Sequence, residues 1–203
     1  MFTLQESELI INSDGSIYHL HLRPEHIAEN IIIVGDPQRV EIISSYFDTI
    51  DVKITNREFV THTGTYKGKR ITAMASGIGT DNIDILMNEL DALVNIDLEN
   101  RSIKEKKTTL NIIRLGTSGA LQADVPVDSF VASSHGFGMD GLLNYYADGD
   151  SIKDHQMQAE FLNQANWPQD LAQPYFVTAS EKLSAWFNEG FIHGMTATAP
   201  GFY

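Results

Sequence analysis

The run Ile31 to Val34, closed at once by Gly35-Asp36-Pro37, constrains the fold more than any other feature of this chain. Four consecutive β-branched residues followed by glycine are typical of a strand buried on both faces of a parallel or mixed sheet. Asp36 suits the N-cap of a helix and Pro37 its first position. Apolar residues then recur at helical spacing in VEIISSYF. The sequence therefore predicts a strand, a tight turn and a helix.

The rest of the chain predicts further strands and helices in alternation. EFVTHTGTY and RITAMAS alternate around Lys67-Gly68-Lys69 and predict paired strands, so we expect a mixed sheet. Apolar residues between Thr80 and Val94 lie on one helical face. The remaining predicted elements are an exposed excursion over 95–109, strands over 110–115, 130–133, 176–179 and 191–199, a flexible loop around Gly136 and a short helix over 181–188.

Length and composition limit the class of protein. A chain of 203 residues needs only one core, so we expect an α/β fold in which residues 1–203 form a single domain with a mixed β-sheet flanked by helices. The net charge of -13 disfavours nucleic acid and anionic membranes as partners. There are no cysteines, which excludes disulfides and thiolate chemistry. The acidic N-terminal segment does not resemble a secretory signal, and we expect a cytoplasmic protein.

Two arginines mark a predicted anion site at the carboxyl ends of the strands. Arg39 follows Gly35-Asp36-Pro37 by one helical turn, where the helix dipole and the arginine charge both favour an anion. Arg114 interrupts an apolar strand directly before Gly116-Thr117-Ser118-Gly119. A charge in such a position needs an anionic partner, which is either a ligand or a carboxylate of the chain. Open α/β sheets bind ligands at this edge, so both arginines indicate one crevice.

Other residues carry weaker predictions. Arg57 precedes an alternating strand and, by itself, is typical of a surface arginine. Gly77-Ile78-Gly79 has Asn82 where a dinucleotide-binding fingerprint needs its third glycine, which disfavours a nicotinamide cofactor. His19 and His21 would share a face if residues 16–22 formed a strand, but no third ligand accompanies them, so we predict no metal.

The chain contains seven motifs in order: YHLHL, VGDPQRV, NREF, TGTYKGKRI, SGIG, IRLGTSGAL and TATAPGFY. Together they resemble the motifs of the nucleoside phosphorylases, and in particular of the uridine phosphorylase branch. The resemblance runs from about Ser16 to Tyr203, while TGTYKG is also similar to the bacterial purine branch. After SGIG, residues 80–84 depart from the small residues and serines of the family, and the 95–109 excursion is longer than in the short bacterial enzymes.

The resemblance implies the fold of the family and the reversible phosphorolysis of a nucleoside, uridine or another pyrimidine nucleoside first, to the free base and ribose 1-phosphate. It implies no cofactor beyond inorganic phosphate as co-substrate, and a homodimer or hexamer with shared sites. Arg114 and Arg39 would act in catalysis. Phosphate would be bound by Gly35, Arg39, Arg57, Arg114 and Thr117, and the nucleoside by His19, Thr117, Ser118, Gly119 and Phe202, with His19 and Arg57 reaching into a neighbouring subunit.

Three functions stay open at this point. In the family the pattern continues beyond Phe202-Tyr203 with Gln, Arg and Glu-Met-Glu segments that bind base and ribose, so we expect this chain to be part of a longer protein. The alternatives to a pyrimidine phosphorylase are a purine phosphorylase or nucleosidase on the same fold, and a non-catalytic nucleoside or phosphate-binding protein if the chain is complete. Nucleosidases of this group generally lack the phosphate arginines, whereas Arg39, Arg57 and Arg114 are present here.

Overall fold

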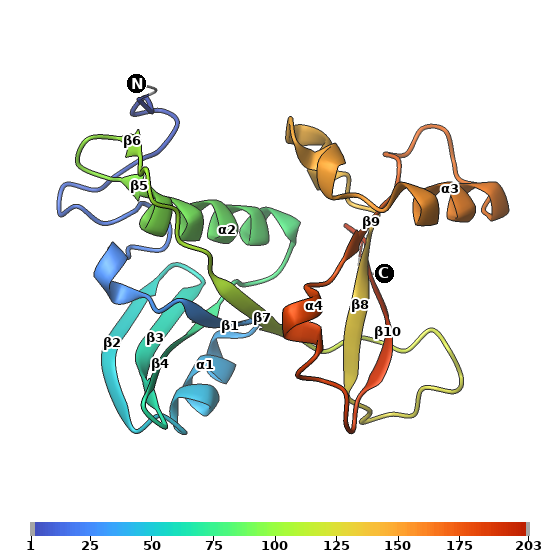
Figure 1. Ribbon diagram of the computed structural model, residues 1–203, viewed down its shortest axis with the longest axis horizontal. Coiled ribbons are helices and arrows are strands. Elements are labelled where there is room, and N and C mark those ends of the chain that lie inside the picture. The colour runs from blue at the N-terminus through green and yellow to red at the C-terminus, as the bar shows by residue number, and fades with distance from the viewer. Residues whose placement is uncertain (1–2, 202–203) are drawn as a thin grey trace. The chain divides into compact units, whose positions relative to one another are not determined.

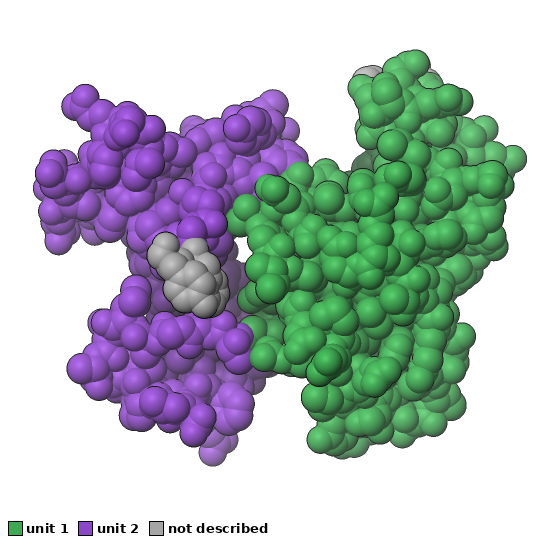
Figure 2. Space-filling model, turned by 180° about the vertical axis from the view of Figure 1, so that it is seen from behind, with its two compact units in different colours: residues 1–116 green, residues 117–203 purple. Residues whose placement is uncertain are grey.

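The computed structural model describes residues 3–201, which form two compact units. Unit 1 ends at Gly116 and unit 2 begins at Thr117 (Figures 1 and 2). The assignment of residues 1–203 to one domain stays a prediction. Among residues 3–201, no helix has both the length and the apolar character needed to cross a membrane.

Unit 1 is built on a five-stranded mixed sheet in the order β2-β3-β4-β1-β7. β1 (Asn30–Val34) lies between β4 (Lys69–Ala75) and β7 (Asn111–Leu115) and pairs in parallel with both. β3 (Phe59–Tyr66) pairs antiparallel with β4 and with β2 (Thr49–Asn56). The mixed α/β fold is thus confirmed, while β2 was not predicted.

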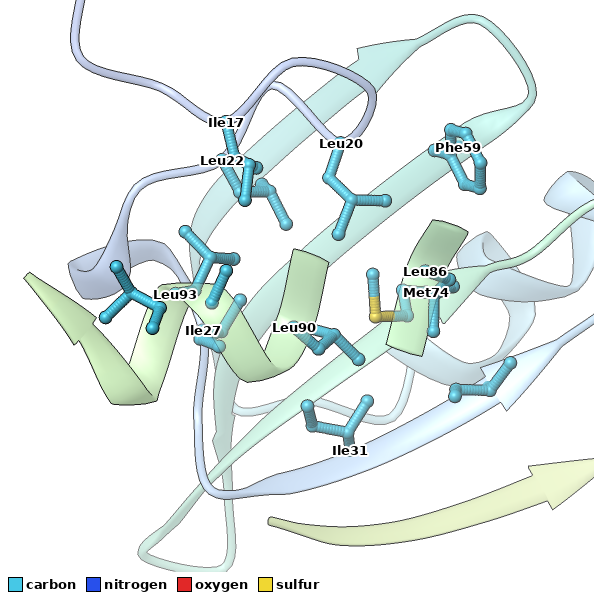
Figure 3. Packing of buried hydrophobic residues seen from close by; sticks show 13 residues of the cluster. Ile17, Leu20, Leu22, Ile27, Ile31, Phe59, Met74, Leu86, Leu90 and Leu93 are labelled. Carbon is cyan, nitrogen blue, oxygen red and sulfur yellow. The ribbon is translucent and has the colours of Figure 1, made fainter. Parts of the chain in front are cut away.

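Helices cover both faces of this sheet because the side chains of each strand alternate between the faces. Val34 and Ala75 pack with Val40 of α1 (Pro37–Ser44). Ile31 and Met74 pack instead in the larger cluster under α2 (Thr80–Asn95). The helix contributes Leu86, Leu90 and Leu93 to this cluster. Figure 3 shows this cluster closing under the N-terminal loop, from which Ile17, Leu20 and Leu22 point inward.

The connection from α2 to β7 is tied to the helix end. Asn95 is buried, and its side chain donates to Asp91 and to the carbonyl of Thr108 while it accepts the amide of Thr108. β5 (Ile96–Asp97) and β6 (Ser102–Ile103) form a short hairpin between these points. The predicted excursion over 95–109 is therefore held at its two ends by the hydrogen bonds between Asn95 and Thr108, and it contains a two-stranded sheet.

Unit 2 has a three-stranded sheet in the order β10-β8-β9. β8 (Val131–Gly138) is parallel to β10 (Ile192–Thr198) and antiparallel to β9 (Tyr175–Thr178). Phe137 and Phe176 stack at a centroid distance of 4.6 Å, and Phe161 of α3 (His155–Gln164) packs against both rings. This aromatic group is the core of the unit.

Several expectations for unit 2 were wrong. Gly136 lies inside β8 and pairs with Val177, so the predicted flexible loop is a strand as far as Gly138. The glycines misled the prediction because cross-strand pairing outweighs their low strand propensity. α3 was not predicted, and α4 covers Glu181–Ser184 rather than 181–188. Short 3-10 helices complete the chain at Pro24–His26 in unit 1 and at Leu142–Tyr145 and Gly149–Ile152 in unit 2.

Candidate functional site

The carboxyl ends of β4, β1 and β7 meet at one edge of the unit 1 sheet, and a glycine follows each strand. Gly35 follows β1, Gly116 follows β7, and Gly77 follows Ser76 after β4. The Ser76 amide donates to the carbonyl of Val34, and this bond holds the turn after β4 beside the turn after β1. A Cβ on Gly35 would lie 3.6 Å from the carbonyl oxygen of Gly77. The edge therefore has a backbone surface with few side chains.

Arg114 places its guanidinium over this backbone surface. In β7 it pairs with Ile33 of β1. Its Nη2 lies 3.8 Å from the position of a Cβ on Gly35, and a Cβ on Gly116 would overlap Nη1. The side chain is exposed and forms no ion pair or hydrogen bond with any residue in 3–201. The carboxylate partner considered from the sequence is thus absent from the described part of the chain.

The start of α1 satisfies much of its own hydrogen bonding. The Asp36 side chain accepts the amide of Gln38, and the Asp36 carbonyl accepts that of Arg39. Pro37 has no amide hydrogen. The amides of Gln38 and Arg39 are therefore already bonded within the chain. The half-buried Arg39 side chain forms no ion pair or hydrogen bond within residues 3–201 and so keeps its donors available.

A second group of predicted residues gathers at the turn between β2 and β3. Arg57 lies in this turn with φ of 54°, and its Nη2 donates to the hydroxyl of Tyr18 over 3.2 Å. The Nδ2 of Asn56 donates to the carbonyl of His19 over 2.8 Å. The tertiary structure therefore brings Arg57 and His19, 38 positions apart in the chain, to one region of unit 1.

Glu89 belongs to this group, although it was not singled out from the sequence. It is 7% exposed, and its Oε1 lies 2.6 Å from Nδ1 of His19. A usable signal was present, because Glu89 stands three positions after Leu86 and four before Leu93 and so shares their face of α2. An acidic residue on an apolar helix face needs a polar partner.

The expected strand at residues 16–22 is wrong. Ile17 forms an isolated bridge with Ile11, and residues 18–20 form a turn. The ring nitrogens of His19 and His21 contact different carboxylates, those of Glu89 and Asp14. His21 has φ of 55°, which breaks the alternation that would place both rings on one face.

The predicted base-binding residues belong to unit 2. Thr117, Ser118 and Gly119 are exposed and belong to unit 2. Phe202 lies outside the described residues. Unit 1 thus brings together Gly35 with Arg114, and His19 with Arg57, while the roles of the other residues stay predictions.

Comparison with known proteins places this arrangement in a family. Residues 29–203 match the model of the phosphorylase superfamily. The uridine phosphorylase of Thermococcus kodakarensis is 27% identical over 94% of this chain and 57% of its own length. A DeoD-type purine nucleoside phosphorylase of Listeria welshimeri is 36% identical over 56% of this chain and 43% of its own length. The chain thus spans about half the length of these curated relatives.

The fold of this chain is also found in solved structures. The crystal structure of a Trypanosoma brucei nucleoside phosphorylase that shows uridine phosphorylase activity has a TM-score of 0.86 and 31% identity, covering 96% of this chain and 70% of its own. The uridine phosphorylase of Vibrio fischeri, at 19% identity and a TM-score of 0.61 over 95% of this chain and 68% of its own, shares the fold. The chain therefore belongs to the phosphorylase superfamily, within which it resembles the uridine phosphorylases.

Proposed function

We propose that the protein to which this chain belongs catalyses phosphorolysis of a nucleoside, with uridine as the preferred substrate. A phosphate oxygen would attack C1′ of the ribose while the bond from C1′ to the base nitrogen breaks and its electron pair leaves with the base. The observation that carries the proposal is the Arg114 guanidinium, which has no ion pair or hydrogen bond within residues 3–201 and lies over the glycine backbone at the sheet edge.

The phosphate would be held by Gly35, Arg39, Arg57, Arg114 and Thr117. Guanidinium groups bind phosphate oxygens in pairs, and the absence of a Cβ at Gly35 lets the anion approach the backbone. Fixing the dianion beneath the sugar favours an oxocarbenium-like transition state both by position and by charge. Arg114 and Arg39 would supply most of this stabilisation. No protein nucleophile and no cofactor beyond phosphate is needed.

The nucleoside would be bound by His19, Thr117, Ser118, Gly119 and Phe202. His19 would contact the ribose 5′-hydroxyl in a neighbouring subunit, and Arg57 would reach the same neighbour. A homodimer or hexamer in the cytoplasm is part of this proposal. The closeness of Arg57 and His19 in unit 1 supports their acting together on one neighbour.

Purine nucleoside phosphorolysis is the second candidate. The similarity to DeoD-type purine nucleoside phosphorylases over about half of the chain favours it. A panel of uridine, thymidine, inosine and adenosine decides between the two, since the preferred base has the highest kcat/KM.

The central experiment measures base release with and without inorganic phosphate. We expect release of uracil from uridine to need phosphate, and Arg114→Ala to lower kcat/KM for phosphate by about 100-fold to 1000-fold, as for loss of one preorganised donor. Arg23→Ala is the matched control, because the exposed Arg23 guanidinium pairs only loosely with Asp14, at 3.9 Å. Equal release without phosphate would overturn the proposal in favour of hydrolysis.

A further inference from the structure

Glu89 has a buried carboxylate, and both of its oxygens accept hydrogen bonds from the segment His19-Leu20. Oε1 accepts the amide of His19 over 3.0 Å, and Oε2 accepts the amide of Leu20 over 2.8 Å. Oε1 also lies 2.6 Å from Nδ1 of the His19 ring. A buried carboxylate is costly unless it is fully bonded, and these contacts offset that cost. The carboxylate is therefore committed to the His19 segment.

The segment is held on its other sides as well. Asn56 donates to the carbonyl of His19 over 2.8 Å. The Tyr18 ring meets the His19 ring edge-on at a centroid distance of 4.8 Å. Leu20 is buried in the core beside α2 (Figure 3). The backbone and ring plane of His19 are thus fixed from four directions.

The contact with Glu89 also decides which ring nitrogen carries the proton. An ionised carboxylate only accepts hydrogen bonds, so in a neutral imidazole Nδ1 must be the donor. Nε2 then presents a lone pair. Nε2 forms no hydrogen bond within residues 3–201, and 29% of the His19 side chain is exposed. The ring is prepared to accept a hydrogen bond from a group outside unit 1.

We propose that Glu89 is a positioning residue that holds His19 as the Nδ1-protonated tautomer, so that Nε2 accepts a hydrogen bond from the ribose 5′-hydroxyl of a nucleoside. The choice of nucleoside hydroxyl as the donor rests on the proposed function; the tautomer rests on the contacts in unit 1. A hydroxyl is the matching group because it donates to a lone pair. Glu89 itself touches no substrate.

The first test reads the tautomer directly and needs no activity. Long-range proton–nitrogen NMR spectra of the 15N-labelled protein at pH 8.5 distinguish protonated Nδ1 from protonated Nε2, since an ordinary histidine is neutral there. Comparison with His19→Asn assigns the signals. We expect protonated Nδ1 in the wild type and a gain of protonated Nε2 in Glu89→Gln, whose amide nitrogen can face Nδ1. A wild-type His19 protonated at Nε2, or at both nitrogens, overturns the proposal.

The second test compares uridine with 5′-deoxyuridine, which lacks the donor. We expect the wild type to prefer uridine in kcat/KM by about tenfold to 100-fold, the range for a hydrogen bond to a polarised partner. Glu89→Gln should remove most of this preference by lowering kcat/KM for uridine alone, as should His19→Ala. If the role of Glu89 were merely structural, Glu89→Gln would lower kcat/KM equally for uridine and for 5′-deoxyuridine. That result contradicts the proposal. Glu99→Gln is the matched control, because the Glu99 side chain is exposed and forms no hydrogen bond or ion pair within residues 3–201.

The two tests separate the possible failures. If the wild type releases no base while NMR shows Nδ1 protonated only when Glu89 is present, the proposed function fails and the tautomer assignment stands. If the wild type is active and Glu89→Gln keeps the preference for uridine, the positioning role fails and the proposed function stands. If the thermal unfolding curve shows that Glu89→Gln does not fold, the tautomer of His19 in the wild type still decides whether the proposal holds.

Discussion

The guanidinium carbon of Arg57 lies 5.3 Å from the centroid of the Tyr18 ring, and its Nη2 donates to the Tyr18 hydroxyl. These contacts join the turn between β2 and β3 to the N-terminal loop. They also leave the other guanidinium donors of Arg57 without a partner among residues 3–201. Tyr18 therefore orients an arginine whose proposed ligand is the phosphate bound in a neighbouring subunit.

Substituting Tyr18 separates the two contacts. Tyr18→Phe removes the hydrogen bond but keeps the ring, whereas Tyr18→Ala removes both. Exposed cation–π contacts contribute about 0.5 to 1 kcal/mol. We expect Tyr18→Ala to raise KM for phosphate about threefold to fivefold and Tyr18→Phe to raise it less, in steady-state kinetics with phosphate varied. Equal effects of the two variants would show that the ring face contributes nothing.

Gly35→Ala tests the space beside Arg114 without disturbing the fold. The new methyl group would meet its nearest neighbours at 3.6 and 3.8 Å, which is ordinary contact. We expect an unfolding free energy within about 1 kcal/mol of the wild type and a KM for phosphate at least about tenfold higher, because the methyl group fills the proposed phosphate position. Gly136→Ala, with nothing within 4 Å, is the control. Unchanged phosphate affinity in Gly35→Ala would place the anion elsewhere.

Gly77→Ala tests the strained turn after β4. Gly77 has φ of +70°, and a Cβ there would lie 2.7 Å from the Asn82 amide nitrogen and 2.9 Å from Glu58 Cγ. Backbone strain and crowding together should cost about 3 kcal/mol. Gly15→Ala has the same sign of φ but open space around it, so it should cost only about 1 kcal/mol. Urea unfolding measures the free energy of unfolding of both variants. Equal losses would mean that the Asn82 and Glu58 side chains move away from the new methyl group at no cost.

The buried pair of Ser44 and His62 predicts a pH-dependent stability. Burial lowers the pKa of His62 below 6.5, and the charge of Lys53 acts in the same direction. The unfolded chain therefore binds more protons at His62 than the folded chain, so this contribution to stability is lost as pH falls below about 6.5. We expect Tm to fall between pH 7.5 and 5 less steeply in His62→Gln than in the wild type.

The control for this measurement is His193→Gln, because His193 is exposed in β10 and its side chain forms no hydrogen bond or ion pair within residues 3–201. Its pH dependence of Tm should match that of the wild type. Nδ1 of His62 lies 2.8 Å from Ser44 Oγ. If Tm of His62→Gln falls with pH as steeply as Tm of the wild type, this buried ring has no part in the acid sensitivity.

Sequence patterns were sufficient where a local signal and the final packing agree. The strand ending at Val34, the Asp36 cap and the helix from Pro37 were all predicted and are present. Patterns failed where pairing overrode local propensity. Gly136 is a strand residue because β9 and β10 flank β8, and residues 16–22 form no strand because the loop instead packs on α2. β2 was missed although Val52 and Ile54 alternate with exposed residues.

By itself, the sequence determined the class of fold, the turn after β1 and the presence of unusual arginines, because these depend on nearest neighbours along the chain and on the cost of a charge in an apolar strand. The tertiary structure alone decided that the Arg114 guanidinium lies beside Gly35, which follows the neighbouring strand, and that Glu89 holds His19, 70 positions away. Such contacts form only when strands and helices pack, since the free energy that selects them comes from burial shared by distant segments.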